Sequence, residues 1–165
     1  MKKLCIFLFS VILIYQSTSK AYSPDPENFV KELVSEAINK LSDKNTNDEE
    51  KSKFIEKVAL ENVDINALGL YTLGELRKSA EVEDLKDYQN SFRKYFLKSL
   101  TSRLIDYSTS KFEISGEDKK SANYTIVNSK VLPEDGSPEI KIDWRIYTKN
   151  PEKPLIRDLI VEGLS

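Results

Sequence analysis

Carboxylates are the side chains that this sequence offers for catalysis. Asp64, Asp143 and Asp158 each stand among apolar residues, where burial raises a carboxyl pKa and prepares the group for acid–base work. Each also has a structural interpretation. Asp64 precedes an expected helix and suits its N-cap, and Asp143 alternates outward on an expected strand. Asp158 has Arg145 and Arg157 as candidate ion-pair partners. We favour the structural roles, so no catalytic residue is predicted.

Other reactive side chains are scarce. The 165 residues contain no His, and the one Cys and the one Met both fall within residues 1–21. Residues 22–165 therefore offer no disulfide, no thiol, no histidine-activated serine and no ordinary zinc site. They also lack the spacing of an EF-hand and a glycine-rich phosphate loop. We expect neither an enzyme, nor a cofactor, nor a bound metal.

The charge balance argues against nucleic acid as a partner. The whole sequence has 25 basic and 27 acidic residues, a formal charge of −2. Without the segment 1–21, which holds Lys2, Lys3 and Lys20, 22 basic residues face 27 acidic ones and the charge is near −5. Nucleic acid binding normally requires clustered positive charge.

Aromatic residues are the more informative feature. Thirteen of the 16 lie after residue 21, and five fall on one expected long helix over residues 81–107: Tyr88, Phe92, Tyr95, Phe96 and Tyr107. Such a stripe is more typical of an ordinary core, and less often of a ligand cavity between helix and sheet. The pattern alone leaves both interpretations open.

The apolar periodicity predicts helices in the first two thirds of the chain. Asp25 suits an N-cap and Pro26 a first helical position, and apolar residues then recur at helical spacing to residue 41. Further helices are expected over residues 48–62, 65–71 and 81–107, with a loop at 42–47.

The period changes from 3.6 to 2 after residue 107, which predicts strands. The first begins at Phe112 and is expected to end in a polar turn at residues 116–120. The others are expected from Tyr124 to just before Pro133, over residues 140–147, and over residues 155–162. The fold class is therefore α+β, with helices packed on one face of a curved, roughly four-stranded antiparallel sheet that encloses an apolar cavity.

The beginning of the chain, residues 1–21, has the three-part pattern of a signal peptide. Lys2 and Lys3 precede an apolar run over residues 4–15, and Ser19 and Ala21 suit the −3 and −1 positions of a cleavage site. The run is short for a membrane span, which needs about 20 residues. We expect cleavage after Ala21, export to the periplasm, and a single domain over residues 22–165.

Two blocks of residues, on the long helix with its approach and at the end of the chain, occur in a recognisable order. They are Leu73-Gly74, Lys78-Ser79-Ala80, Tyr88, Phe92-Arg93-Lys94-Tyr95, Leu104 and Tyr107, and the closing Asp158-Leu159-Ile160-Val161-Glu162-Gly163-Leu164-Ser165. This order resembles the MlaC family of periplasmic phospholipid-binding proteins, over roughly residues 26–165.

The resemblance implies a carrier that shuttles phospholipid between an outer-membrane lipoprotein complex and an inner-membrane ABC transporter, maintaining outer-membrane lipid asymmetry. It implies that the acyl chains lie between sheet and helices, with the head group near solvent. By position it implicates Phe92, Tyr95 and Leu100 as lipid-binding residues. To these the strand alternation and the helix stripe add Phe96, Ile142, Trp144 and Ile146. We expect a monomer whose ligand is phospholipid.

Two departures from the family pattern leave an alternative open. Pro154 stands where the family usually has Trp, and the sequence ends at Ser165, where family members continue into a C-terminal helix. These differences predict an altered start of the last strand, or an altered pocket wall, and a cavity open on one side. The alternatives are an interaction protein with a degenerate cavity and, least favoured, an acid–base enzyme on the same scaffold.

Overall fold

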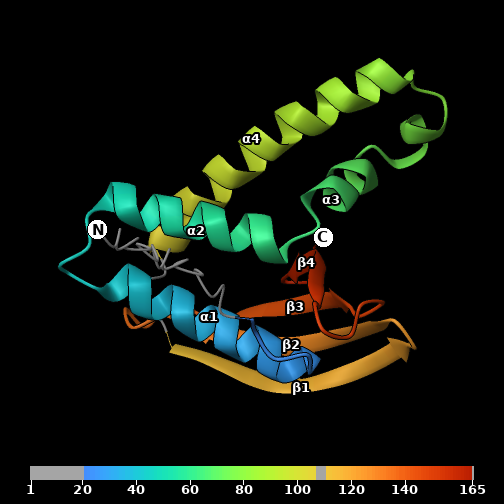
Figure 1. The fold of residues 1–165 in the computed structure, drawn as a ribbon. Coiled ribbons are helices and arrows are strands. Elements are labelled where there is room, and N and C mark those ends of the chain that lie inside the picture. Colours follow the sequence, from blue (N-terminus) through green and yellow to red (C-terminus); the bar gives the residue numbers. More distant parts are fainter. Residues whose placement is uncertain (1–20, 107–110, 165) are drawn as a thin grey trace, which may run out of the picture.

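The structure, a computed structural model, describes residues 21–106 and 111–164. Helices come first and strands follow (Figure 1). The helices are α1 (Pro26–Ser42), α2 (Asp48–Asn62), α3 (Ile65–Thr72), the 3₁₀ helix η1 (Gly74–Lys78) and α4 (Val82–Asp106). The strands are β1 (Lys111–Ser121), β2 (Tyr124–Leu132), β3 (Ile140–Tyr147) and β4 (Leu155–Val161). They form one sheet in the order β1-β2-β3-β4, with every neighbouring pair antiparallel. The predicted α+β class is confirmed.

Side-chain caps fix the starts of α1, α2 and α3. Asp25, Asn47 and Asp64 each place a side-chain oxygen on a backbone N–H three residues ahead, at 2.9, 2.9 and 3.1 Å. Each cap satisfies one of the N–H groups that the first helical turn leaves without a partner. The helix starts predicted at Pro26, after the 42–47 loop and after Asp64 are therefore confirmed.

The main core lies between α1 and one face of the sheet. Phe29 and Val30 of α1 are buried against Val127, Ile146 and Ile156 of the three consecutive strands β2, β3 and β4. Side chains alternate between the two faces of a strand, so this α1-facing surface takes every second residue of β2 and β3. The residues between them point to the opposite face.

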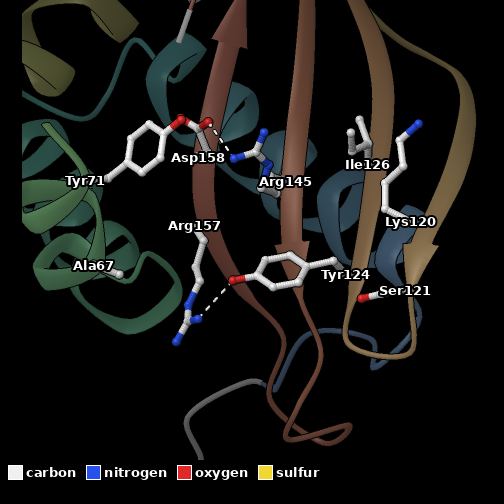
Figure 2. A pocket seen from close by; sticks show the side chains of 9 residues that line it. All are labelled: Ala67, Tyr71, Lys120, Ser121, Tyr124, Ile126, Arg145, Arg157 and Asp158. Atoms are coloured by element: carbon white, nitrogen blue, oxygen red, sulfur yellow. Dashed lines mark hydrogen bonds and ion pairs between the residues drawn. The ribbon is translucent and has the colours of Figure 1, made fainter. Parts of the chain in front are cut away.

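A register shift in β4 places two charged residues on that opposite face. Ile156 pairs with Ile146, but the next cross-strand pair is Asp158 with Arg145, so Arg157 is the extra residue of a bulge. Bulges re-aim side chains that strict alternation would direct to the other face. Arg157 and Asp158 consequently lie side by side on the face away from α1 (Figure 2).

The predicted turn at residues 116–120 is wrong. β1 continues through it to Ser121, and the turn to β2 is formed by Ala122 and Asn123. Gly116 has φ of 151°, in a region that favours glycine, and the β1–β2 register shifts between Ile114 and Gly116. The glycine thus accommodates an irregularity within the strand instead of ending it.

Helix α4 leans away from the sheet and packs against α2 and α3 (Figure 1). From Val82 to Leu104 the only buried residue of α4 is Thr101, and the apolar side chains between them are half-buried or exposed. Within the described ranges, no helix is both long enough and apolar enough to cross a membrane. Most of the apolar stripe of α4 is thus only half covered by the rest of the protein.

Candidate ligand-binding site

Two of the predicted lipid-binding residues, Phe92 and Phe96, belong to an aromatic row along α4. The ring of Phe92 stacks between those of Tyr88 and Phe96, with centroid separations of 6.1 and 6.0 Å. Phe92 also lies over Gly69 of α3, where an added Cβ would come within 3.0 Å of the Phe92 ring. Glycine at this position therefore lets α3 and α4 approach closely, and the row is half-buried along their junction.

The other two predicted helix residues have different surroundings. Leu100 packs with Leu104 against a small cluster that includes Leu41 and Ile55 from α1 and α2. Tyr95 is 72% exposed. Leu100 thus lies at the inner end of α4, whereas the Tyr95 side chain faces solvent.

The predicted strand residues Ile142, Trp144 and Ile146 lie on the α1-facing surface of β3. Ile146 is fully buried and Trp144 is half-buried at the edge of the same core. The Trp144 indole Nε1–H donates to Ser129 Oγ at 2.8 Å, and the Ser129 hydroxyl donates to the Ile142 carbonyl at 2.9 Å. This chain of hydrogen bonds holds the indole in place.

The structure therefore places the seven predicted residues in two groups. Those on β3 pack under α1, and those on α4 follow the junction with α3 and α2, except Tyr95, which faces solvent. Neither group lines the pocket of about 530 Å³ that lies between α3 and the strands. Their contact with lipid stays a prediction.

That pocket lies on the face of the sheet away from α1, between α3 and the strands (Figure 2). Its volume is about 530 Å³. Charged, aromatic and aliphatic groups share the lining, which consists of Ala67, Tyr71, Lys120, Ser121, Tyr124, Ile126, Arg145, Arg157 and Asp158. Of the three carboxylates considered for catalysis from the sequence, Asp158 alone lines it.

Arg145 and Asp158 form an ion pair across the floor of this pocket. Arg145 Nη1 is 3.3 Å from Asp158 Oδ2, and the two residues are cross-strand partners on β3 and β4. The Asp158 side chain is 6% exposed, whereas that of Arg145 is 35% exposed. The carboxylate therefore lies beneath the guanidinium, which faces the pocket. The ion pair expected for Asp158 is confirmed, with Arg145 as its partner.

Arg157 is held by three groups at the wall of the pocket. Its Nε donates to Asp64 Oδ2 and its Nη1 to the Tyr124 hydroxyl, both at 2.9 Å. Its Cζ lies 3.5 Å from the centroid of the Tyr147 ring, a cation–π arrangement. Partial burial acts to lower the pKa of Arg157, but the contacts with Tyr124 and Asp64 outweigh it and raise that pKa.

The three carboxylates considered for catalysis all have structural interactions. Asp64 caps α3 and binds Arg157, and Asp158 pairs with Arg145. Asp143 accepts a hydrogen bond from Asn128 Nδ2 at 2.8 Å. Over residues 21–106 and 111–164, no group of three or more acidic side chains is placed to hold a metal ion.

Sequence reasoning missed the pocket because its residues come from a strand face that was read as solvent-exposed. The alternation of β3 marks Arg145 as pointing away from the α1-facing core, which is correct. The bulge that puts Asp158 on the same face as Arg157 is a register irregularity between two strands. The one available signal was the succession of an arginine and an aspartate in an otherwise apolar strand.

Two comparisons with known proteins found matches. The family model described as MlaC protein matches residues 28–165. The solved structure of a phospholipid-binding protein from Ralstonia solanacearum, determined in complex with a phospholipid, is similar with a TM-score of 0.68 and 15% sequence identity. The similarity covers 85% of this chain and 79% of that one. Among curated proteins, no sequence matches.

Proposed function

Because the chain belongs to the MlaC family, as the match over residues 28–165 shows, we propose that it is a phospholipid-binding protein and not an enzyme. Family membership is the observation that carries the proposal. The fold shared with the Ralstonia solanacearum protein supports it, since that protein was solved with a phospholipid bound.

The half-buried row on α4 gives the proposal a physical basis. Tyr88, Phe92 and Phe96 stack along α4 and are only half covered by the protein. Leaving apolar surface half exposed costs free energy that burial under acyl chains would recover, at about 25 cal/mol per Å². A row of this kind accepts hydrocarbon without fixed polar contacts, so it suits a ligand that must also be released.

A carrier must bind lipid tightly enough to extract it from a membrane and weakly enough to release it. Two acyl chains carry roughly 30 methylenes, whose transfer from water is worth about 24 kcal/mol at about 0.8 kcal/mol each. The lipid, however, starts in a bilayer that is equally apolar. A carrier must therefore match the bilayer closely, because weaker burial fails to extract the lipid and stronger burial fails to deliver it.

The finer proposal is a periplasmic carrier. In it the chain is exported with residues 1–21 as signal peptide, acts as a monomer, and exchanges phospholipid with an outer-membrane lipoprotein complex and an inner-membrane ABC transporter complex. Outer-membrane lipid asymmetry is maintained by this traffic. Residues 1–20 lie outside the described part of the chain, so the export step is supported by the sequence pattern alone.

Mass spectrometry of an organic extract tests the proposal. The mature protein is purified from a periplasm without detergent, beside an unrelated periplasmic protein of similar size as the control for adventitious lipid. Near-stoichiometric phospholipid in the first sample and little in the second is the expected result. A folded protein that carries no lipid would contradict the proposal and favour an interaction protein with a degenerate cavity.

A further inference from the structure

The pocket on the face away from α1 has an unusual charge distribution. Three of its four charged lining residues are cationic, namely Lys120, Arg145 and Arg157. The carboxylates that pair with Lys120 and Arg157 are Asp118 and Asp64, and neither lines the pocket. Each of the three cations has a carboxylate partner, but Asp158 is the one partner that lines the pocket, so the lining itself carries more positive than negative groups.

The two guanidinium groups are fixed in position before any ligand arrives. Asp64 and Tyr124 bind two nitrogens of Arg157, and the Tyr147 ring lies beneath it. Asp158 holds Arg145 through Nη1. A guanidinium has five N–H donors, so these contacts leave donors for a ligand. Groups that are already ordered lose little conformational entropy on binding, which favours affinity.

The remaining lining residues can contact the hydrocarbon portion of a ligand. Ala67 and Tyr71 of α3 and Ile126 of β2 form walls beside the cationic groups, and the Tyr71 ring extends toward Asp158 (Figure 2). A small inorganic anion would use the guanidinium groups alone. A phosphate ester with a glycerol or acyl portion would use both the charged and the apolar parts of the lining.

We propose that this pocket binds the phosphodiester of a phospholipid head group, with Arg145 as its donor and with Lys120 and Arg157 adding positive charge to the lining. Guanidinium groups match phosphate oxygens in geometry and can bind them through two parallel hydrogen bonds. The inference rests on the proposed function and adds to it a polar subsite on the sheet face that α1 does not cover. The site selects the phosphate that phospholipids share.

The test uses soluble probes and a matched pair of lysine variants. Lys120 lines the pocket, whereas its neighbour Lys119 is cross-strand partner to the inward-facing Thr125 and does not line it. Both lysines are exposed, so Lys120→Gln and Lys119→Gln should fold equally well. Binding of dihexanoylphosphatidylcholine, dihexanoylglycerol, glycerophosphocholine and inorganic phosphate is followed by chemical-shift changes in the mature protein.

We expect dihexanoylphosphatidylcholine to shift the pocket resonances of the wild type. Lys120→Gln should weaken the binding of this lipid about threefold, as for an exposed charge pair. Lys119→Gln should bind like the wild type. The double variant Arg145→Gln/Asp158→Asn, which removes the pair without leaving one charge behind, should weaken binding about tenfold. Dihexanoylglycerol lacks the phosphate, so its binding affinity should be the same for the wild type and all three variants.

Three results would overturn the proposal. The first is equal binding of dihexanoylphosphatidylcholine by all variants, or pocket resonances that do not move. The second is that the variants weaken the binding of dihexanoylglycerol as much as they weaken the binding of dihexanoylphosphatidylcholine. The third is inorganic phosphate binding as tightly as the lipid probes, which would make this a free-phosphate site. Lipid co-purifying with the wild type in any of these cases would leave the proposed carrier function standing.

Discussion

The carboxylate of Asp64 makes two contacts with its two oxygens. Oδ1 accepts from the Ala67 N–H at 3.1 Å and caps α3, while Oδ2 accepts from Arg157 Nε at 2.9 Å. The same side chain therefore starts a helix and ties it to β4. The adjoining backbone adds to this link, since the Asp64 N–H donates to the Ile156 carbonyl at 2.9 Å. α3 is thereby fixed at the edge of the sheet, beside the pocket.

Replacing Asp64 should separate these two contributions. Asp64→Asn keeps a capping oxygen but loses the charge, and we expect it to cost up to about 1 kcal/mol of unfolding free energy. Asp64→Ala loses both contacts and should cost about 2 kcal/mol. Urea denaturation measures both values. Asp25→Asn, at the α1 cap, should change little and serves as the control; equal losses for Asp25→Asn and Asp64→Asn would show that the link to Arg157 contributes nothing.

Replacing Arg145 should cost more unfolding free energy than replacing its ion-pair partner Asp158. Arg145→Met removes a 35% exposed guanidinium above a carboxylate that is 6% exposed and should cost about 2 kcal/mol, below the scale for breaking a fully buried pair. Asp158→Asn should cost about 1 kcal/mol, because water reaches Arg145 in part. The comparison is made by urea denaturation, with Lys141→Met on the same strand as the exposed control. A larger loss for Asp158→Asn would contradict this account of the pair.

The close approach of α3 and α4 depends on Gly69. Gly69→Leu would push against the Phe92 ring, which already lies 3.0 Å from the position of an added Cβ, and should cost about 2 kcal/mol through overpacking. Adding Phe92→Ala to the same chain should recover part of that loss, because it removes the ring that the larger side chain at position 69 would overlap. Thermal unfolding of the single and double variants measures the coupling. Additive losses would mean that the two residues do not compete for space.

Lipid retention should depend on the half-buried row of α4. Phe96→Glu places a charge beside the stacked rings, and we expect the amount of co-purified phospholipid to fall at least about tenfold, a difference of about 1.4 kcal/mol. Val82→Glu introduces the same group at a site that is 76% exposed on the same helix and should leave the lipid content unchanged. Mass spectrometry of matched extracts gives the ratio. Equal lipid in both variants would place the acyl chains elsewhere.

Local signals allowed much of this fold to be predicted from the sequence. The caps Asp25 and Asp64 and the alternation of residues 140–147 depend on neighbours a few positions away, and these elements were predicted at their observed places or within one residue. The turn predicted at 116–120 failed because a glycine followed by charged residues is typical of a turn, whereas here it lies within an edge strand.

The arrangement of the site was harder to predict because it depends on how elements meet. Helical spacing identifies Phe92 and Phe96 as sharing a face, but it does not say that α3 covers that face in place of the sheet. Likewise, no local pattern predicts the register shift that puts Asp158 on the same sheet face as Arg157. Relationships of this kind are set by pairing between distant segments.

The composition of β1 has a consequence for self-association. β1 is the first strand of the sheet order, so one of its sides has no strand partner in the described part of the chain. Four consecutive exposed charges occupy its second half, Glu117, Asp118, Lys119 and Lys120, next to the irregularity at Gly116. Charges and bulges on an outer strand discourage a second sheet from docking there. The chain can therefore keep apolar surface open on α4 while its sheet resists growing into aggregates.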